Sequence, residues 1–385
     1  MTETTRRWIA GAVIAFCVAI GVDGSQVANV MQTTDRSDRP RVVEQTSTVD
    51  ASIEEEAVRD GLGAAGFIEI PENVTATLST LEKLDDYPVY TMRYLGSYIR
   101  ASELEREIEG NTGQANKSTS SSGWSCSLLA AAADSEQAVL GRNFDWEYSP
   151  ILVLFLEPEE GYRSVMSIDI GYLIEPEWID RLDEAPVEQL LPLLSAPFLT
   201  FDGMNEKGVA IGMASVDYEC NYPSDPSKRD VGDLQLMREL LEASATVDEA
   251  ITFLEGVNPA SQGGPNTHYL IADRTSAALI EYHNGEMYVF RSSVEAPWQL
   301  GTNFPVILTE GSPGGHCWRY DQIEATLREY GGALTVDEAG DLLQAVSTPM
   351  TRWSIVYDLA NLQMHLTIER NTETVHVFSL GDRRD

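Results

Sequence analysis

Short apolar runs of strand length dominate the chain after residue 126, and their order limits the folds that it can adopt. A stretch with helical spacing separates an early block of such runs from a later one. Strands are expected at Leu128–Ala132, Val139–Phe144, Ile151–Leu156, Val165–Ile170, Val209–Ser215, Tyr269–Ala272, Ala278–Tyr282, Met287–Phe290, Ser354–Tyr357, Met364–Ile368 and Val375–Phe378. Two packed layers of mostly antiparallel strands with helices outside would bury these runs, which indicates an α+β fold.

Capping signals predict where two of the expected helices begin. Thr246 with Glu249, and Thr335 with Glu338, have the spacing of a capping box. The dipeptide Asn284-Gly285 predicts a tight hairpin. Helices are expected at Ile53–Leu62, Thr75–Leu84, Asp233–Leu241, Val247–Leu254, Trp318–Tyr330 and Val336–Val346, and an early strand at Val89–Leu95.

Cys126 is the candidate nucleophile, because Arg142 and Asp145 follow it in the run Gly141-Arg142-Asn143-Phe144-Asp145-Trp146. The thiolate is the reactive form of cysteine, and a nearby cation lowers the pKa of a thiol from roughly 8.5. Arg142 can supply that charge, but arginine cannot accept a proton in a protein, so another group must act as the base.

Two candidates for that base remain open. The histidines lie in no recognisable catalytic phrase, which leaves a papain-like cysteine–histidine site possible but unsupported. They are His268, His283, His316, His365 and His376. The other candidate is a free α-amino group on Cys126 itself, since an α-amine with a pKa of about 7.7–8.0 suits general base catalysis near neutral pH.

Four phrases of the chain carry a resemblance to a known family. They are Cys126-Ser127-Leu128 through Gly141–Trp146, then Asp202-Gly203-Met204-Asn205-Glu206-Lys207-Gly208, Thr302-Asn303-Phe304 and Cys317-Trp318-Arg319-Tyr320. In this order they resemble the N-terminal-nucleophile (Ntn) hydrolases of the choloylglycine hydrolase and penicillin acylase kind. The chain looks especially like their acyltransferase relatives, which include acyl-coenzyme A:6-aminopenicillanic acid acyltransferase. The resemblance covers roughly Tyr87 to Phe378.

The resemblance implies a four-layer αββα sandwich and a precursor that cuts itself before Cys126, so that the new α-amine serves as the base. It implies that Cys126 is the nucleophile and that Arg142 and Asp145 position the thiolate and the amine. Asn303 would donate a hydrogen bond to the oxyanion of the tetrahedral intermediate. Arg319 would complete the polar floor of the site.

Ser215 departs from the family pattern. Bile-salt and penicillin V hydrolases carry a second oxyanion asparagine at the position that aligns with it. A hydroxyl or a backbone N–H can donate in its place, although losing one oxyanion donor can cost about 100-fold in rate.

Each motif also has a purely structural explanation. Cys126 would then be a buried inert thiol, Arg142 and Asp145 an ordinary ion pair, Asn205–Gly208 a turn between strands, Asn303 a loop residue and Arg319 a surface charge.

The chain is strongly acidic, with a net charge of −35 from 61 acidic and 26 basic residues, of which only four are lysines. Such a surface repels phosphate backbones, so a nucleic-acid partner is not expected. Acidity with few lysines fits a protein that works in high salt, where repulsion between like charges is screened. An acidic protein from a GC-rich genome would show the same composition.

The chain is expected to divide into four parts. Residues 1–22 are interpreted as a signal peptide or membrane anchor, because Arg6-Arg7 precedes the uncharged run Trp8 to Val22 and loosely resembles a twin-arginine export signal. Residues 23–50 are expected to be a disordered stalk, residues 51–125 a pro-segment and linker, and residues 126–385 the catalytic domain. Export would permit a disulfide between Cys220 and Cys317, and two free thiols are equally consistent with the sequence.

These features together predict an exported, self-processing cysteine amidohydrolase of linear, non-peptide amides, acting through an acyl-thioester. The expected partner is a small-molecule acyl amide, with no cofactor or metal and with membrane contact only through the N-terminal segment. An acyltransferase, or a catalytically silent surface-binding protein of the same fold, remains the alternative. The sequence leaves open the substrate and whether the chain forms a homo-oligomer.

Overall fold

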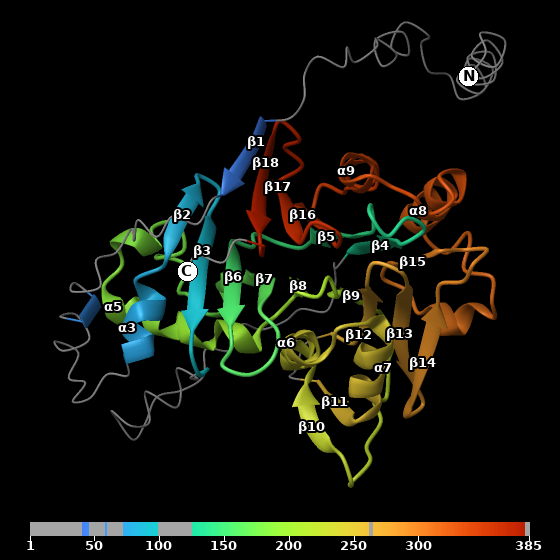
Figure 1. The fold of residues 1–385 in the computed structure, drawn as a ribbon, viewed down its shortest axis with the longest axis horizontal. Helices are drawn as coiled ribbons and strands as arrows, with labels where there is room; N and C mark the ends of the chain where they lie inside the picture. The colour runs from blue at the N-terminus through green and yellow to red at the C-terminus, as the bar shows by residue number, and fades with distance from the viewer. Residues whose placement is uncertain (1–40, 46–57, 60–71, 99–124, 262–264, 382–385) are drawn as a thin grey trace, which may run out of the picture. The chain divides into compact units, whose positions relative to one another are not determined.

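The computed structural model describes residues 41–45, 58–59, 72–98, 125–261 and 265–381 (Figure 1). The chain divides into a unit of Met1–Arg41, of which only Arg41 is described, and a unit of Val42–Asp385. The expected leader, most of the expected stalk, residues 99–124 before Cys126 and almost all of the helix expected at Ile53–Leu62 therefore lie outside the described residues. Within the expected stalk, Arg41–Gln45 form a strand.

One sheet of the second unit contains nine strands within the described residues, in the order β14-β13-β12-β9-β8-β7-β6-β3-β2. Neighbouring strands pair antiparallel except β3 and β6, which run parallel. The strands are β2 (Glu82–Asp85), β3 (Val89–Leu95), β6 (Ile151–Glu157), β7 (Ser164–Asp169), β8 (Asp202–Asn205), β9 (Ala210–Ser215), β12 (Thr267–Ala272), β13 (Ala277–His283) and β14 (Glu286–Arg291). We call this the nine-stranded sheet.

The other large sheet contains seven strands within the described residues, in the order β1-β18-β17-β16-β5-β4-β15. They are β1 (Arg41–Gln45), β4 (Ser127–Ala131), β5 (Val139–Asp145), β15 (Trp298–Gly301), β16 (Thr351–Asp358), β17 (Gln363–Ile368) and β18 (Thr374–Ser379). We call this the seven-stranded sheet. A short parallel pair, β10 (Arg229–Gly232) and β11 (Val257–Ala260), lies apart from both.

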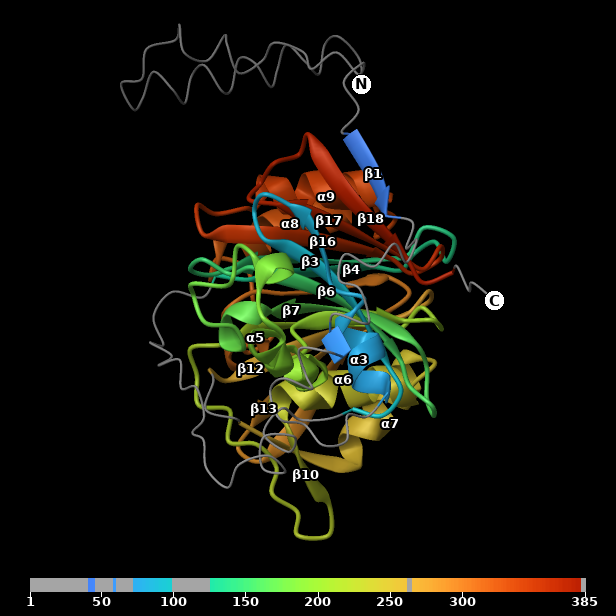
Figure 2. The same cartoon turned by 90° about the vertical axis from the view of Figure 1, so that its left-hand side faces the viewer.

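The two sheets pack face to face, with helices on both outer faces (Figures 1 and 2). Strands β4, β5 and β15 contact β9, β12 and β13 across the interface. Helices α8 (Trp318–Glu329) and α9 (Val336–Ala345) cover the seven-stranded sheet, and α6 (Asp233–Ala243) and α7 (Val247–Glu255) cover the nine-stranded sheet. The predicted four-layer αββα sandwich is confirmed.

Glycine allows the two sheets to approach each other closely at β9. A Cβ atom built on Gly212 would lie 3.0 Å from Leu128 Cδ2 and 3.6 Å from Arg142 Cδ. Any larger residue would push the sheets apart at this point, because buried side chains already fill the space. Gly212 thus lets Arg142 lie against the backbone of the opposite sheet.

Most expected elements after residue 126 form within one or two residues of the predicted bounds. Asn284 and Gly285 both have positive φ, 51° and 78°, as a tight hairpin of the predicted kind requires. Thr335 forms a complete capping box with Glu338. Thr246 and Glu249 form only half of the predicted capping box. The Thr246 hydroxyl accepts from the N–H of Glu249, but the Glu249 carboxylate accepts from the N–H of Ala245 and not from that of Thr246.

The helix expected at Thr75–Leu84 is wrong in its second half. Helix α3 (Glu72–Leu78) ends early, and the chain then enters the nine-stranded sheet as β2. The Thr80 hydroxyl accepts a hydrogen bond of 2.8 Å from the backbone N–H of Arg93 in β3, which ties the chain to the sheet instead of to a further helical turn.

Several short elements were not expected, because they lack a clear apolar alternation. They are β1, which lies in the expected stalk, β2, β8, β10, β11, β15, the short helix α5 (Val187–Leu190) and the 3-10 helices η1 (Ile170–Tyr172), η2 (Leu182–Glu184), η3 (Leu191–Phe198) and η4 (Val306–Thr309). Among the described residues, no helix combines the length and the hydropathy that crossing a membrane would require.

Candidate active site

Cys126 lies immediately before β4 and is completely buried. Antiparallel pairing of β4 with β5 places Leu128 opposite Arg142, so the end of β5 returns beside the cysteine. The Arg142 Nη2 atom lies 3.9 Å from Cys126 Sγ. The backbone N–H of Asp145 also donates to the sulfur. The sheet register therefore explains why these residues meet.

Burial raises the pKa of the Cys126 thiol above its ordinary value, and the positive charge of Arg142 offsets only part of that rise. The expectation that Arg142 lowers the thiol pKa is correct for the contribution of its charge, but the net direction is upward. In the intact chain the sulfur is thus held mainly as a thiol, which reacts more slowly than a thiolate.

Arg142 is shared between Cys126 and a carboxylate that the sequence analysis did not single out. Its Nη1 atom forms an ion pair with Asp202, and both side chains are fully buried. Asp202 begins β8 in the nine-stranded sheet, whereas Arg142 belongs to the seven-stranded sheet. The hydroxyl of Tyr357, from β16, donates to the other oxygen of Asp202. Three strands from two sheets thereby fix the guanidinium.

Asp145 ends β5, and the hydrogen bonds of its carboxylate go to two threonines in the intact chain. Thr351 Oγ1 donates to one oxygen at 2.6 Å and Thr348 Oγ1 to the other at 3.1 Å. Burial raises the pKa of Asp145 to about 6, against the opposing effects of these hydroxyls and of Arg319. Each carboxylate oxygen keeps a further lone pair for a donor such as an α-amine.

Arg319, at the start of α8, reaches the peptide bond that precedes Cys126. Its Nη1 atom donates to the carbonyl oxygen of Ser125 at 2.7 Å, to that of Cys126, and to Ser127 Oγ at 2.9 Å. The side chain is buried, so solvent does not compete for these bonds. The guanidinium therefore polarises the carbonyl on which a cut between Ser125 and Cys126 would act.

Asn303 connects Arg319 to Ser215. Its Oδ1 atom accepts from Arg319 Nη2 at 3.0 Å, and its Nδ2 atom donates to the carbonyl oxygen of Ser215 at 2.9 Å and to Ser215 Oγ at 3.1 Å. Because Ser215 Oγ accepts this bond, its own O–H remains to donate to another group.

All six residues predicted for the site therefore lie in one hydrogen-bonded cluster. Sequence reasoning assigned no role to Asp202, Tyr357, Thr348 and Thr351, which contact the cluster. Asp202 is the first residue of one of the four phrases that carry the family resemblance. A carboxylate in that phrase was the signal that could have identified it as a partner of Arg142. Tyr357 and Thr351 belong to strand β16 and Thr348 to the loop before it, and nothing in the sequence around them indicates a site.

Three of the five histidines form hydrogen bonds with residues outside the six-residue cluster. His268 pairs with Glu281, His283 with Tyr218 and His376 with Asp85. Cys220 and Cys317 are both free thiols, which settles the alternative that the sequence left open. These contacts give no support to a papain-like site.

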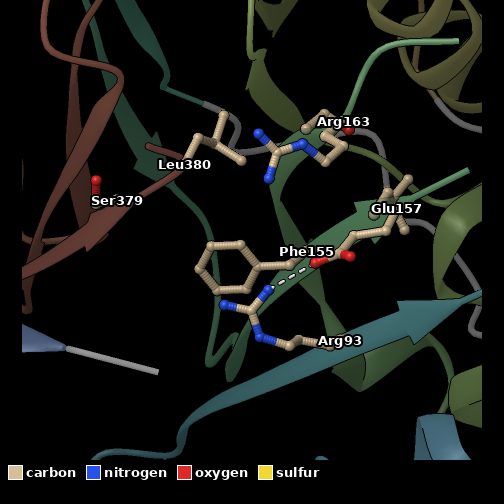
Figure 3. Close-up of a pocket in the computed structure, with 8 residues that line it drawn as sticks. Arg93, Phe155, Glu157, Arg163, Ser379 and Leu380 are labelled. Atoms are coloured by element: carbon tan, nitrogen blue, oxygen red, sulfur yellow. Dashed lines mark hydrogen bonds and ion pairs between the residues drawn. The ribbon is translucent and has the colours of Figure 1, made fainter. Parts of the chain in front are cut away.

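A small cavity lies away from this cluster, between the ends of β6, β7 and β18 (Figure 3). Its volume is about 10 Å³, which is room for about one water molecule. Arg93 and Glu157 form an ion pair of 2.9 Å on its wall. The cavity contains none of the six candidate residues, so it is not the substrate site.

Residues 126–302 match the model of the linear amide C–N hydrolases, choloylglycine hydrolase family. A mutant conjugated bile acid hydrolase from Clostridium perfringens is 16% identical, with a TM-score of 0.48 over 67% of this chain and 93% of that chain. Penicillin V acylase from Agrobacterium tumefaciens is 18% identical, with a TM-score of 0.43 over 63% of this chain and 83% of that chain. A comparison with curated proteins finds no match. The predicted family resemblance is confirmed by the family match.

The raised pKa of Asp145 predicts a pH dependence of stability. Between about pH 4 and pH 6 the folded chain keeps a proton that the unfolded chain has released, so the free energy of unfolding falls as the pH rises. This stabilisation is complete below about pH 4 and lost through about pH 6, and it amounts to roughly 2–3 kcal/mol. Asp145→Asn should remove this pH dependence.

Urea unfolding at several pH values between 4 and 7 measures the effect. Both proteins should carry Cys126→Ala, so that each remains uncut. The free energy of unfolding of the aspartate form should fall relative to that of the asparagine form as the pH rises, because asparagine has no carboxyl group to ionise. Parallel curves would show that Asp145 titrates normally.

Proposed function

Since residues 126–302 match the choloylglycine hydrolase family of linear amide C–N hydrolases, we propose that the chain is a self-processing cysteine amidohydrolase. It would cleave linear, non-peptide amides through an acyl-thioester on Cys126. The observation that carries the proposal is the 2.7 Å hydrogen bond from Arg319 to the Ser125 carbonyl, directly beside the buried thiol.

The first step would be the cut that frees the α-amine. Cys126 Sγ attacks the carbonyl carbon of Ser125, negative charge gathers on the carbonyl oxygen, and Arg319 donates to that oxygen. The C–N bond between the two residues then breaks, and the thiol proton ends on the departing amine. Water hydrolyses the resulting thioester, which releases the preceding segment and leaves a chain that begins at Cys126.

The same groups would then serve the external substrate. The free α-amine takes the thiol proton, because its pKa of about 7.7–8.0 suits a general base and Arg142 cannot accept a proton. The thiolate attacks the amide carbonyl, and the oxyanion receives a hydrogen bond from the spare O–H of Ser215. Asn303 Nδ2 gives a second one by turning one of its two N–H groups from Ser215 to the oxyanion. The amine leaves with a proton, and water hydrolyses the thioester to the free acid.

Self-processing is the first test of this function. Intact-mass analysis should find a chain that starts at Cys126, and Cys126→Ala should stay uncut. Arg319→Lys should slow the cut at least tenfold, because an ammonium lacks the planar fork that binds Ser125 and Asn303 together.

Arg328→Lys is the matched control, since Arg328 lies on the same helix with its side chain 68% exposed. It should cut at the wild-type rate. An active protein that keeps the bond between Ser125 and Cys126 would rule out the free-amine mechanism.

An acyltransferase, in which an amine takes the acyl group, is the alternative that one observation favours. Cys126 is fully buried in the intact chain, and a thioester shielded from water survives long enough to meet an amine. A panel of N-acyl amides, each assayed with and without glycine as acceptor, separates the two. We expect free acid at a rate that glycine does not change, whereas acyl-glycine formed in place of the acid would establish transfer.

A catalytically silent binding protein is the remaining alternative, and it rests on Ser215 replacing an asparagine. The free O–H of Ser215 weakens that argument. A chain that neither cuts itself nor releases acid from any member of the panel would favour it.

A further inference from the structure

Glu281, on β13, is a buried carboxylate whose two oxygens are both engaged. Its side chain is 3% exposed. Oε1 accepts from the backbone N–H of Val306 at 2.7 Å and from His268 Nδ1 at 2.9 Å, and Oε2 accepts from the backbone N–H of Ile307 at 2.7 Å. Charge-assisted bonds of this kind are stronger than bonds between neutral groups. Glu281 thus binds the start of η4 to the nine-stranded sheet.

His268, on β12, supports this carboxylate and contacts the chain before Asn303. Because an ionised carboxylate only accepts hydrogen bonds, Nδ1 of the histidine carries the proton that is shared with Glu281. The opposite edge of the ring lies against Gly301: a Cβ atom built there would be 3.2 Å from both Cε1 and Nε2 of His268. A Cβ atom at Gly301 would therefore press on the His268 ring where β15 ends.

The segment Thr302–Pro305 is held at both ends by these contacts. Its first end follows Gly301, which pairs with Leu128 in the seven-stranded sheet. Its second end enters η4, which Glu281 holds on the nine-stranded sheet. Asn303 lies in this short span, and its amide joins Ser215 to Arg319.

We propose that Glu281, supported by His268, is a positioning residue for Asn303 and, through Asn303, for the guanidinium of Arg319. The proposal rests on the function proposed above, because it assigns Glu281 a role in the same chemistry. Glu281 itself touches no reacting atom. Its carboxylate ties the far end of the segment that carries the oxyanion donor to the nine-stranded sheet, while the near end follows β15 of the seven-stranded sheet, which carries the nucleophile.

Glu281→Gln tests this role with almost no change of shape. A carboxamide has one accepting oxygen, so its NH₂ group must face either the N–H of His268 or a backbone N–H of η4. A buried donor then loses its partner and the segment shifts. A matched control is Asp273→Asn, because Asp273 is also a buried carboxylate that accepts from backbone N–H groups, those of Val247, Thr275 and Ser276.

The readout is the first-order rate of cutting between Ser125 and Cys126, followed by intact mass and combined with Asn303→Ala in a double-mutant cycle. Glu281→Gln should slow the cut at least tenfold in the wild-type background and less than twofold in the Asn303→Ala background. Residues that act through one another lose their effects non-additively, whereas a general loss of stability acts equally in both backgrounds. Asp273→Asn should cut at the wild-type rate.

The outcomes distinguish this inference from the proposed function. An equal slowing by Glu281→Gln in both backgrounds, or an equal slowing by Asp273→Asn, overturns the positioning role and leaves self-processing intact. A wild-type chain that does not cut itself overturns the proposed function, and the inference with it. If Glu281→Gln yields no folded protein, His268→Gln enters the same cycle, and we expect it to slow the cut at least threefold in the wild-type background only.

Discussion

The buried ion pair between Arg142 and Asp202 is the interaction on which the rest of this structure depends. It joins the two sheets through their interface, with Arg142 from one and Asp202 from the other. Two charges can be removed from water only if each is paired and hydrogen-bonded, and here Tyr357 satisfies the second oxygen of the carboxylate. The pair therefore requires the sheets to meet in one register. That register holds the guanidinium beside the sulfur of Cys126.

Two guanidinium groups place positive charge at two different reacting atoms of this site. Arg142 lies against the sulfur, where burial alone would keep the thiol protonated. Arg319 lies against the carbonyl oxygen of Ser125, where negative charge would develop during a cut. Each group is held by the opposite side of the site, Arg142 by Asp202 and Arg319 by Asn303. The chemistry we propose thus follows from the way the two layers and their helices are fixed relative to each other.

The sequence predicted those parts of the fold and site that depend on local patterns. Apolar periodicity located the strands and helices after Cys126. Four motif phrases located five of the six candidate residues, and the sixth, Ser215, was located by its position after the second phrase. The pattern could not reveal Asp202, Tyr357 or Glu281, because their roles come from contacts between residues distant in sequence. Strand β8 was missed for the same reason, since Asp202–Asn205 is strand only through its pairing with β7 and β9. The helix expected at Thr75–Leu84 failed where pairing with β3 overrode local helical preference.

The pH dependence of Cys126 alkylation in the processed protein tests the central claim, that Arg142 stabilises the thiolate, most directly. The measurement compares the wild type with Arg142→Lys, and with Arg163→Lys as a control whose ion pair with Glu206 lies outside the cluster. Lysine keeps the charge but cannot bind Asp202 and the sulfur at once. The account predicts that alkylation of the Arg142→Lys protein rises at a higher pH than in the wild type and the control. Three superimposable profiles would contradict it.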